Sequence, residues 1–148
     1  MHSSIFLPPL RELSGTYQAF GVYSSAHMRS LGLTPAQFDI VVTLGNTPGM
    51  TTMQLSEKTL ITKDTRTGVV DCLVDKKLVR RVALPGDGRC QIVQLTAQGE
   101  KLFVRIFPAH LAHMESAFAQ LSQKEVNGMT ESLRRLRGVF ADAHSARE

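Results

Sequence analysis

Three capping boxes divide this chain into helices before any other pattern is considered. In each box a Ser or Thr oxygen can accept hydrogen bonds from free backbone N–H groups, and a Gln or Glu follows three residues later. The boxes begin at Thr34, Thr51 and Ser122. Thr62 and Thr96 offer weaker caps before two further segments of helical length. The chain is therefore expected to be mostly helical.

The spacing of apolar residues predicts six helices and one change of period. The helices are expected over residues 9–30, 35–45, 52–60, 63–77, 97–120 and 123–144. Pro108 is expected to bend the fifth of them. Between Leu78 and Leu95 two β-rich runs flank the turn Pro85-Gly86-Asp87-Gly88-Arg89, which is typical of a hairpin. The predicted fold class is mainly α with a small β hairpin.

Composition and charge exclude several classes of protein. The chain has 148 residues, of which 43% are hydrophobic and 20% charged, so it is an ordinary globular chain rather than a disordered one or a large multi-domain enzyme. Its longest apolar runs span three residues, whereas a membrane helix needs about twenty. Residues 1–10 contain Pro8-Pro9 and lack a basic region, so no secretory signal and a cytoplasmic location are expected. Cys72 and Cys90 are expected to be free thiols.

The positive charge is concentrated in one part of the sequence. A helix, a short helix, a turn, an amphipathic helix and a basic hairpin follow one another in the order of a winged helix-turn-helix. From Thr62 to Arg89 seven bases stand against four acids, which places +3 of the net charge of +4 in this segment. Because binding of duplex DNA requires cations along the phosphates, this segment is the candidate DNA-binding surface.

Short motifs in this region follow one another in a characteristic order across residues 33–103. They are Leu33-Thr34-Pro35-Ala36-Gln37-Phe38, Thr52 to Ser56, Thr67, Val70-Asp71, Leu73, Leu78-Val79-Arg80-Arg81, Asp87-Gly88-Arg89 and Leu95-Thr96-Ala97-Gln98-Gly99. This ordered set resembles the MarR family of bacterial winged helix-turn-helix transcription regulators. The resemblance implies a cytoplasmic homodimer that binds a pseudo-palindromic operator, usually as a repressor released by a small ligand such as an aromatic compound.

The resemblance also implies a division of the chain and a set of DNA-contacting residues. Residues 33–95 would form the DNA-binding lobe, and residues 1–32 and 96–148 a helical dimerisation lobe. Arg89 matches the arginine at the wing tip, and Asp87 matches the acidic position that shapes the wing. The candidates on the recognition helix are Lys63, Asp64, Thr65, Thr67 and Gly68.

Three features depart from the family pattern. Gly68 and Cys72 stand where an arginine is often found, which weakens the positive side of the recognition helix. Lys77 stands where a glycine usually closes that helix, so a left-handed cap there would be strained or replaced. Arg66 falls on the apolar side of the helical wheel, and its place in the first turn of the helix offers its side chain a way out of the core.

Other functions are weighed against DNA binding. Cys72 and Cys90 could form a thiol redox switch, and the winged helix could serve protein contacts alone, as a dimer that does not bind DNA. His110 and His113, with His27 and Glu115, could suggest a metal site, but packing or surface roles are more usual and no metal or cofactor is expected. An enzyme is not expected, because no nucleophile elbow, phosphate loop or paired carboxylates are present. The resemblance places Tyr17, Phe20, Tyr23, Phe103, Phe107 and Phe118 near an effector pocket, although core packing suits most of them.

Overall fold

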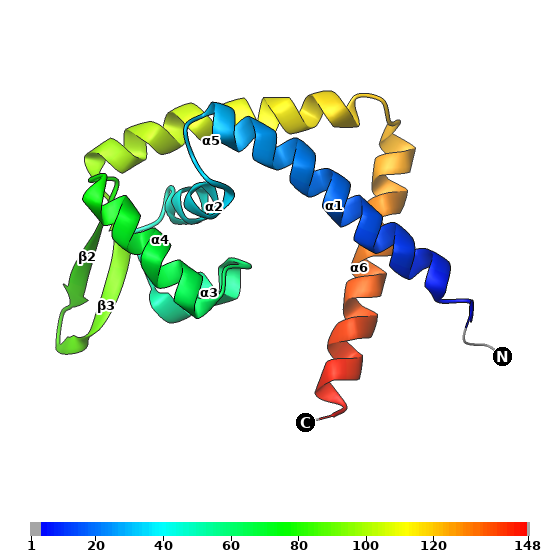
Figure 1. The fold of residues 1–148 in the computed structure, drawn as a ribbon. Coiled ribbons are helices and arrows are strands. Elements are labelled where there is room, and N and C mark those ends of the chain that lie inside the picture. Colours follow the sequence, from blue (N-terminus) through cyan, green and yellow to red (C-terminus); the bar gives the residue numbers. More distant parts are fainter. Residues whose placement is uncertain (1–3, 148) are drawn as a thin grey trace. The chain divides into compact units, whose positions relative to one another are not determined.

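The computed structural model describes residues 4–147. The chain divides into two compact units, Met1–Leu111 and Ala112–Glu148, with the boundary inside the fifth helix. In the described range the elements follow in the order α1 (Leu7–Ser30), α2 (Pro35–Leu44), β1 (Met50–Thr51), α3 (Thr52–Lys58), α4 (Lys63–Asp75), β2 (Val79–Leu84), β3 (Asp87–Leu95), α5 (Ala97–Phe118) and α6 (Gln123–Ser145) (Figure 1). The predicted fold class is confirmed, and none of the described helices is long and apolar enough to cross a membrane.

The capping boxes start helices where the sequence predicts them. The hydroxyls of Thr34, Thr51 and Ser122 each accept a hydrogen bond from the backbone N–H three residues on, at 3.1–3.2 Å, and each Gln or Glu returns the contact. Thr96 caps α5 by accepting from the N–H of Gly99 at 3.1 Å. The cap expected at Thr62 is wrong: its hydroxyl makes no cap bond in the described chain and donates to the Thr65 hydroxyl at 3.0 Å.

The sheet has three antiparallel strands in the order β1-β3-β2. The expected hairpin is β2 and β3, with Val79 opposite Leu95 and an irregularity between Ala83 and Leu84. Strand β1 was not predicted, because two residues are too few to show a period, and it pairs Met50 with Val93. In Figure 1 the hairpin extends away from the helices beside α4.

The hydrophobic core lies between α2, α3, α4, the sheet and the start of α5. Its most fully buried side chains are Ile40, Leu44, Leu55, Leu73, Ile106, Val41, Val79 and Val93. Arg66 also lies inside, with 6% of its surface exposed, so the helical wheel is confirmed and the escape expected from the first turn is wrong. The core therefore fixes α4 by one side and sets the angle at which the hairpin leaves it.

The end of α4 is strained in the way the sequence suggests. Lys77 has a φ of 62°, the left-handed conformation that favours glycine. Its N–H donates to the Val74 carbonyl at 2.9 Å, and the N–H of Leu78 donates to the Leu73 carbonyl at 3.0 Å. This pair of bonds is the usual helix-ending motif. A lysine therefore holds the position that turns the chain from α4 into β2.

Candidate nucleic-acid interface

Helix α4 has one buried side and one exposed side. Arg66, Val70 and Leu73 are buried against the core. The recognition-helix candidates all lie on the exposed part, namely Lys63, Asp64, Thr65, Thr67 and Gly68. The packing of α4 thus presents these five residues together to solvent. Of the seven bases in the segment from residue 62 to 89, all but Arg66 are exposed, against four exposed acids, so the exposed charges of this segment are positive in sum.

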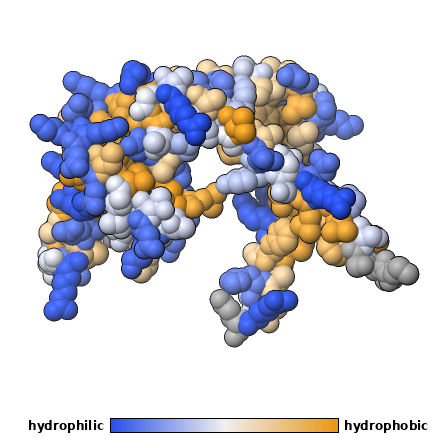
Figure 2. Space-filling model, viewed as in Figure 1, coloured by the Kyte–Doolittle hydropathy of each residue, from blue (hydrophilic) through white to orange (hydrophobic). Residues whose placement is uncertain are grey.

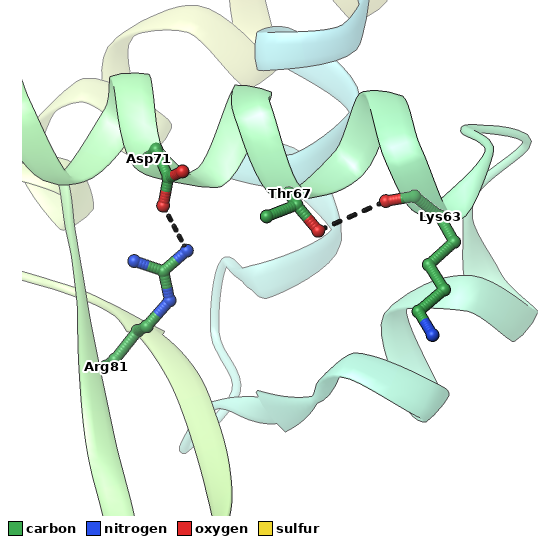
Figure 3. A network of polar contacts seen from close by, with 4 residues as sticks. All are labelled: Lys63, Thr67, Asp71 and Arg81. Atoms are coloured by element: carbon green, nitrogen blue, oxygen red, sulfur yellow. Dashed lines mark hydrogen bonds and ion pairs between the residues drawn. The ribbon is translucent and has the colours of Figure 1, made fainter.

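Polar contacts run along one edge of this exposed side (Figure 3). The Thr67 hydroxyl donates to the Lys63 carbonyl one turn earlier, at 3.2 Å. One turn later, Asp71 accepts a hydrogen bond from Nη2 of Arg81 at 2.6 Å, which is also an ion pair. Because Arg81 belongs to β2, this contact joins the recognition helix to the wing.

The Asp71–Arg81 pair was not predicted from the sequence, where the two residues appear only as charges and as parts of the family motifs. Asp71 lies on α4 and Arg81 on β2, ten residues later, so no helical or strand period relates them. The side chains of Asp71 and Arg81 remain 57% and 33% exposed, so solvent screens their attraction. The pair therefore adds little to the free energy of folding, and its main effect is to orient the two side chains.

The wing carries its own ordering contacts. The Asp87 carboxylate accepts a hydrogen bond from the backbone N–H of Arg89 at 3.1 Å, a side-chain turn that shapes the start of β3. Gly86 next to it has a φ of 84°, which the turn requires. On β2, Arg80 donates to the Gln94 side chain across the hairpin. The Arg89 side chain is exposed, and Figure 2 shows a hydrophilic group projecting at the tip of the wing.

The structure separates the predicted residues into two groups. The five α4 residues share one surface of the helix, while Asp87 and Arg89 lie beyond the β2–β3 turn. Both cysteines are free and half-buried. Cys72 faces away from the candidate DNA surface, since its Sγ accepts a hydrogen bond from Gln37 of α2 at 3.4 Å.

A pocket of about 970 Å³ is lined by residues of α1 and α2, by Lys58, Leu60 and Ile61 at and after the end of α3, and by His110 of α5. Its walls are mostly apolar and include Tyr17, Phe20 and Phe38. Of the six aromatics assigned to an effector pocket, Tyr17 and Phe20 line it. The core role expected for most of the six is wrong: Phe103 alone is a core residue, and Tyr17, Phe20, Phe107 and Phe118 are exposed. The Phe103 ring stacks on that of Phe107 with ring centroids 5.3 Å apart.

Charged and polar side chains stand among the pocket walls. Lys58 and Asp39 are charged members of the lining, and burial raises the pKa of Asp39 above its ordinary 3.8, partly opposed by hydrogen bonds from the Leu60 backbone and the Thr43 hydroxyl. Ser24 and His110 are buried in the lining, with the serine oxygen 3.2 Å from His110 Nε2.

His110 also meets His27 of α1. Their Nδ1 atoms are 2.9 Å apart, so one ring must donate and the other accept. The Phe38 ring packs on the same imidazole with centroids 4.6 Å apart. Within residues 4–147, no three His, Cys, Asp or Glu side chains are grouped as metal ligands would be. The contact between the two imidazole rings links α1 to α5, which gives His27 and His110 a structural role.

Comparison with known proteins gives the same assignment as the geometry. A family model described as MarR family matches residues 31–89. The HTH-type transcriptional regulator MhqR of Bacillus subtilis (strain 168) is 33% identical over 124 residues, which cover 84% of this chain and 86% of that regulator.

Two solved structures are also similar. A probable transcriptional regulator from Pseudomonas aeruginosa is 29% identical with a TM-score of 0.72, over 83% of this chain and 95% of that one. BpsR of Bordetella bronchiseptica, whose DNA binding is regulated by 6-hydroxynicotinic acid, is 26% identical with a TM-score of 0.74, over 84% of this chain and 95% of that one. The chain therefore belongs to the MarR family of transcriptional regulators, which bind DNA and are not enzymes.

Proposed function

We propose that this regulator binds a pseudo-palindromic operator as a homodimer and acts as a repressor that a small ligand releases. The observation that carries the DNA-binding part is the division of α4. Its inner side is anchored in the core by Val70 and Leu73, and five exposed positions at its start share the outer side. A helix fixed in this way can enter a major groove without losing its own packing.

Each predicted site residue has a role in this proposal. Lys63 contacts phosphates, and Asp64, Thr65, Thr67 and Gly68 lie at the base edges. Arg89 enters the flanking minor groove, where negative potential attracts a guanidinium. Asp87 keeps the turn in shape through its bond to the Arg89 N–H.

Dimerisation is supported by apolar side chains that the chain leaves exposed. Four large apolar side chains have about half or more of their surface exposed: Phe6 before α1, Phe20 in α1, and Leu133 and Val139 in α6. Figure 2 shows apolar atoms along the lower part of α6. Water-exposed aromatic and aliphatic rows of this length usually mark a protein interface. We propose residues 1–32 and 96–148 as the dimerisation lobe and residues 33–95 as the DNA-binding lobe.

Ligand response is supported by the pocket between α1, α2 and α5. Its volume of about 970 Å³ and its apolar walls suit a small aromatic molecule, and Ser24, His110 and Lys58 offer polar contacts. A ligand that binds one arrangement of α1 and α5 more tightly shifts the dimer toward that arrangement. Because two recognition helices must lie about one turn of DNA apart, such a shift changes operator affinity.

Selection of bound duplexes from a random pool tests the proposed function. We expect a palindrome with about ten base pairs between half-site centres. Four or five phosphate contacts per subunit would give a salt slope of about −7 to −9. Recovery of a single, unrepeated site would contradict dimeric binding, and no enrichment at low salt would contradict sequence-specific binding by this surface.

Replacement of the wing arginine tests the second contact. Arg89→Ala is expected to weaken operator binding about tenfold or more in fluorescence anisotropy, with an unchanged circular dichroism spectrum, because the side chain is exposed and its removal leaves the Asp87 turn intact. Arg134→Ala, an exposed arginine of α6, is the matched control. Equal affinity of the Arg89 variant and the wild type would remove the wing from the interface.

A further inference from the structure

Thr67 lies on the outer side of α4, and its hydroxyl and its methyl group point in different directions. Its hydroxyl is directed back along the helix to the Lys63 carbonyl, at 3.2 Å. The methyl group lies on the other side of the Cβ, toward Asp71, as Figure 3 shows. The side chain is exposed. A base edge that meets Thr67 therefore meets a methyl group as well as an oxygen whose proton is already used.

The polar groups around Thr67 are also occupied within the protein. Asp71 is paired with Arg81 at 2.6 Å, and the Thr65 hydroxyl accepts from the Thr62 hydroxyl at 3.0 Å. Such internal bonds leave the hydroxyls fewer free hydrogen-bonding sites for a base. At residues 67 and 68 the exposed surface then consists of a methyl group, a hydroxyl oxygen whose proton is already used, and helix backbone.

Gly68 makes this surface accessible. Apart from the two neighbouring residues and the adjacent backbone of α4, no heavy atom in the described part of the chain lies within 4 Å of the position that a Cβ would take at Gly68. The backbone of α4 can thus come closer to the floor of a groove here than at a position with a side chain. A close approach at residue 68 brings the Thr67 methyl to the depth of the base edges.

We propose that Thr67 recognises thymine, by contact of its γ-methyl group with the C5-methyl group in each half-site. In the major groove that methyl group distinguishes a T·A pair from all others, and apolar side-chain groups are its natural partners. Gly68 permits the approach, and the bond to Lys63 fixes the rotamer that turns the methyl outward. This inference rests on the proposed function, because it requires that α4 enter the major groove.

Thymine replaced by deoxyuridine, which lacks only the methyl group, gives the direct test. In the selected operator, each thymine of a half-site is exchanged in turn and the dissociation constant is measured by anisotropy. We expect one position at which the exchange weakens wild-type binding about fourfold, or about fifteenfold when both half-sites are changed, which is the scale of one buried methyl group per site. Failure to select any operator would instead contradict the proposed function.

Two variants separate the methyl from the hydroxyl. Thr67→Ser keeps the hydroxyl and should bind the thymine operator about as weakly as the wild type binds the deoxyuridine operator, with no further loss on exchange. Thr67→Val keeps a methyl at the same place and should retain the preference for thymine. Circular dichroism checks that both variants fold, and similar helix propensities make this the expected result.

A matched control is available on another helix. Thr130 of α6 is exposed and donates to the carbonyl four residues earlier, that of Val126 at 2.9 Å, so Thr130→Ser removes the same methyl group from the same local geometry. It should leave the response to deoxyuridine unchanged. The inference is overturned if no thymine position responds to the exchange, or if Thr67→Ser keeps the preference while Thr67→Val loses it, which would assign recognition to the hydroxyl.

Discussion

Helices α4 and α6 are both amphipathic, but only α4 has its apolar side buried within the chain. In α4 the apolar side is covered, with Val70 and Leu73 buried in the core. In α6, whose residues all lie in the described part of the structure, none is buried, and Leu133 keeps 57% of its surface exposed. The apolar row of α4 is covered by the core of the same chain, whereas the apolar row of α6 stays exposed. In the proposed dimer the apolar row of α6 would be covered by the second copy of the chain.

A charge placed in the exposed row of α6 should have the largest effect. Leu133→Glu would bury one unpaired carboxylate per protomer in the proposed dimer, at a cost of several kcal/mol each. We expect the dimer dissociation constant to rise at least about 100-fold, measured by sedimentation equilibrium. Operator binding should fall with it, because one lobe alone contacts only half the site.

Arg134→Glu is the control for this variant, since it introduces the same side chain one residue later, outside the apolar row. It should leave the dimer intact. If Leu133→Glu sediments as the wild type does, then the exposed row of α6 is not the dimer interface and the contrast with α4 loses its explanation.

Two glycines extend the comparison to packing. A Cβ at Gly99 of α5 would overlap the carbonyl oxygen of Leu78 and lie 3.2 Å from Cδ2 of Leu95, so there is no room for it. Gly99→Ala should lower the free energy of unfolding by about 1–3 kcal/mol, measured by urea denaturation. Gly128→Ala of α6 has no described atom within 4 Å and should raise it by about 0.5–1 kcal/mol through helix propensity.

The result for Gly128→Ala also bears on the dimer interface that Leu133→Glu tests. If Gly128→Ala destabilises the protein, a second chain must approach α6 closely at that glycine, and the interface would extend across it. If Gly99→Ala is as stable as the wild type, the close contact between the start of α5 and Leu78, the residue before β2, is not part of the folded state.

The sequence predicted the elements well because their signals are local. Caps such as Thr34 and Ser122 depend on residues three apart, and each starts a helix as expected. The two failures have different causes. Strand β1 forms because Met50 pairs with Val93, which is distant in the sequence. At Thr62 a local alternative replaces the cap, because its hydroxyl bonds to the Thr65 hydroxyl three residues later and not to a helix N–H group.

The candidate site divides along the same line. The exposed side of α4 followed from periodicity, because the buried positions repeat at helical spacing. The Asp71–Arg81 pair and the His27–His110 contact did not, since each joins residues from different elements. His27 and His110 are 83 positions apart in the chain, and no local pattern relates them.

Replacement of Asp39, a half-buried residue of the pocket lining, should have the smallest effect on stability. Its pKa is raised by burial, so the folded state binds that proton more tightly than the unfolded state does. The stability that this provides is fully present below the unfolded pKa and is lost as pH rises through the folded pKa. Asp39→Asn removes the ionisation and should therefore gain stability relative to the wild type on going from pH 3.5 to pH 7, by less than about 1 kcal/mol after solvent screening. Urea denaturation at the two pH values measures it; a difference that shrinks with rising pH would mean that the hydrogen bonds from Leu60 and Thr43 outweigh the burial of the carboxylate.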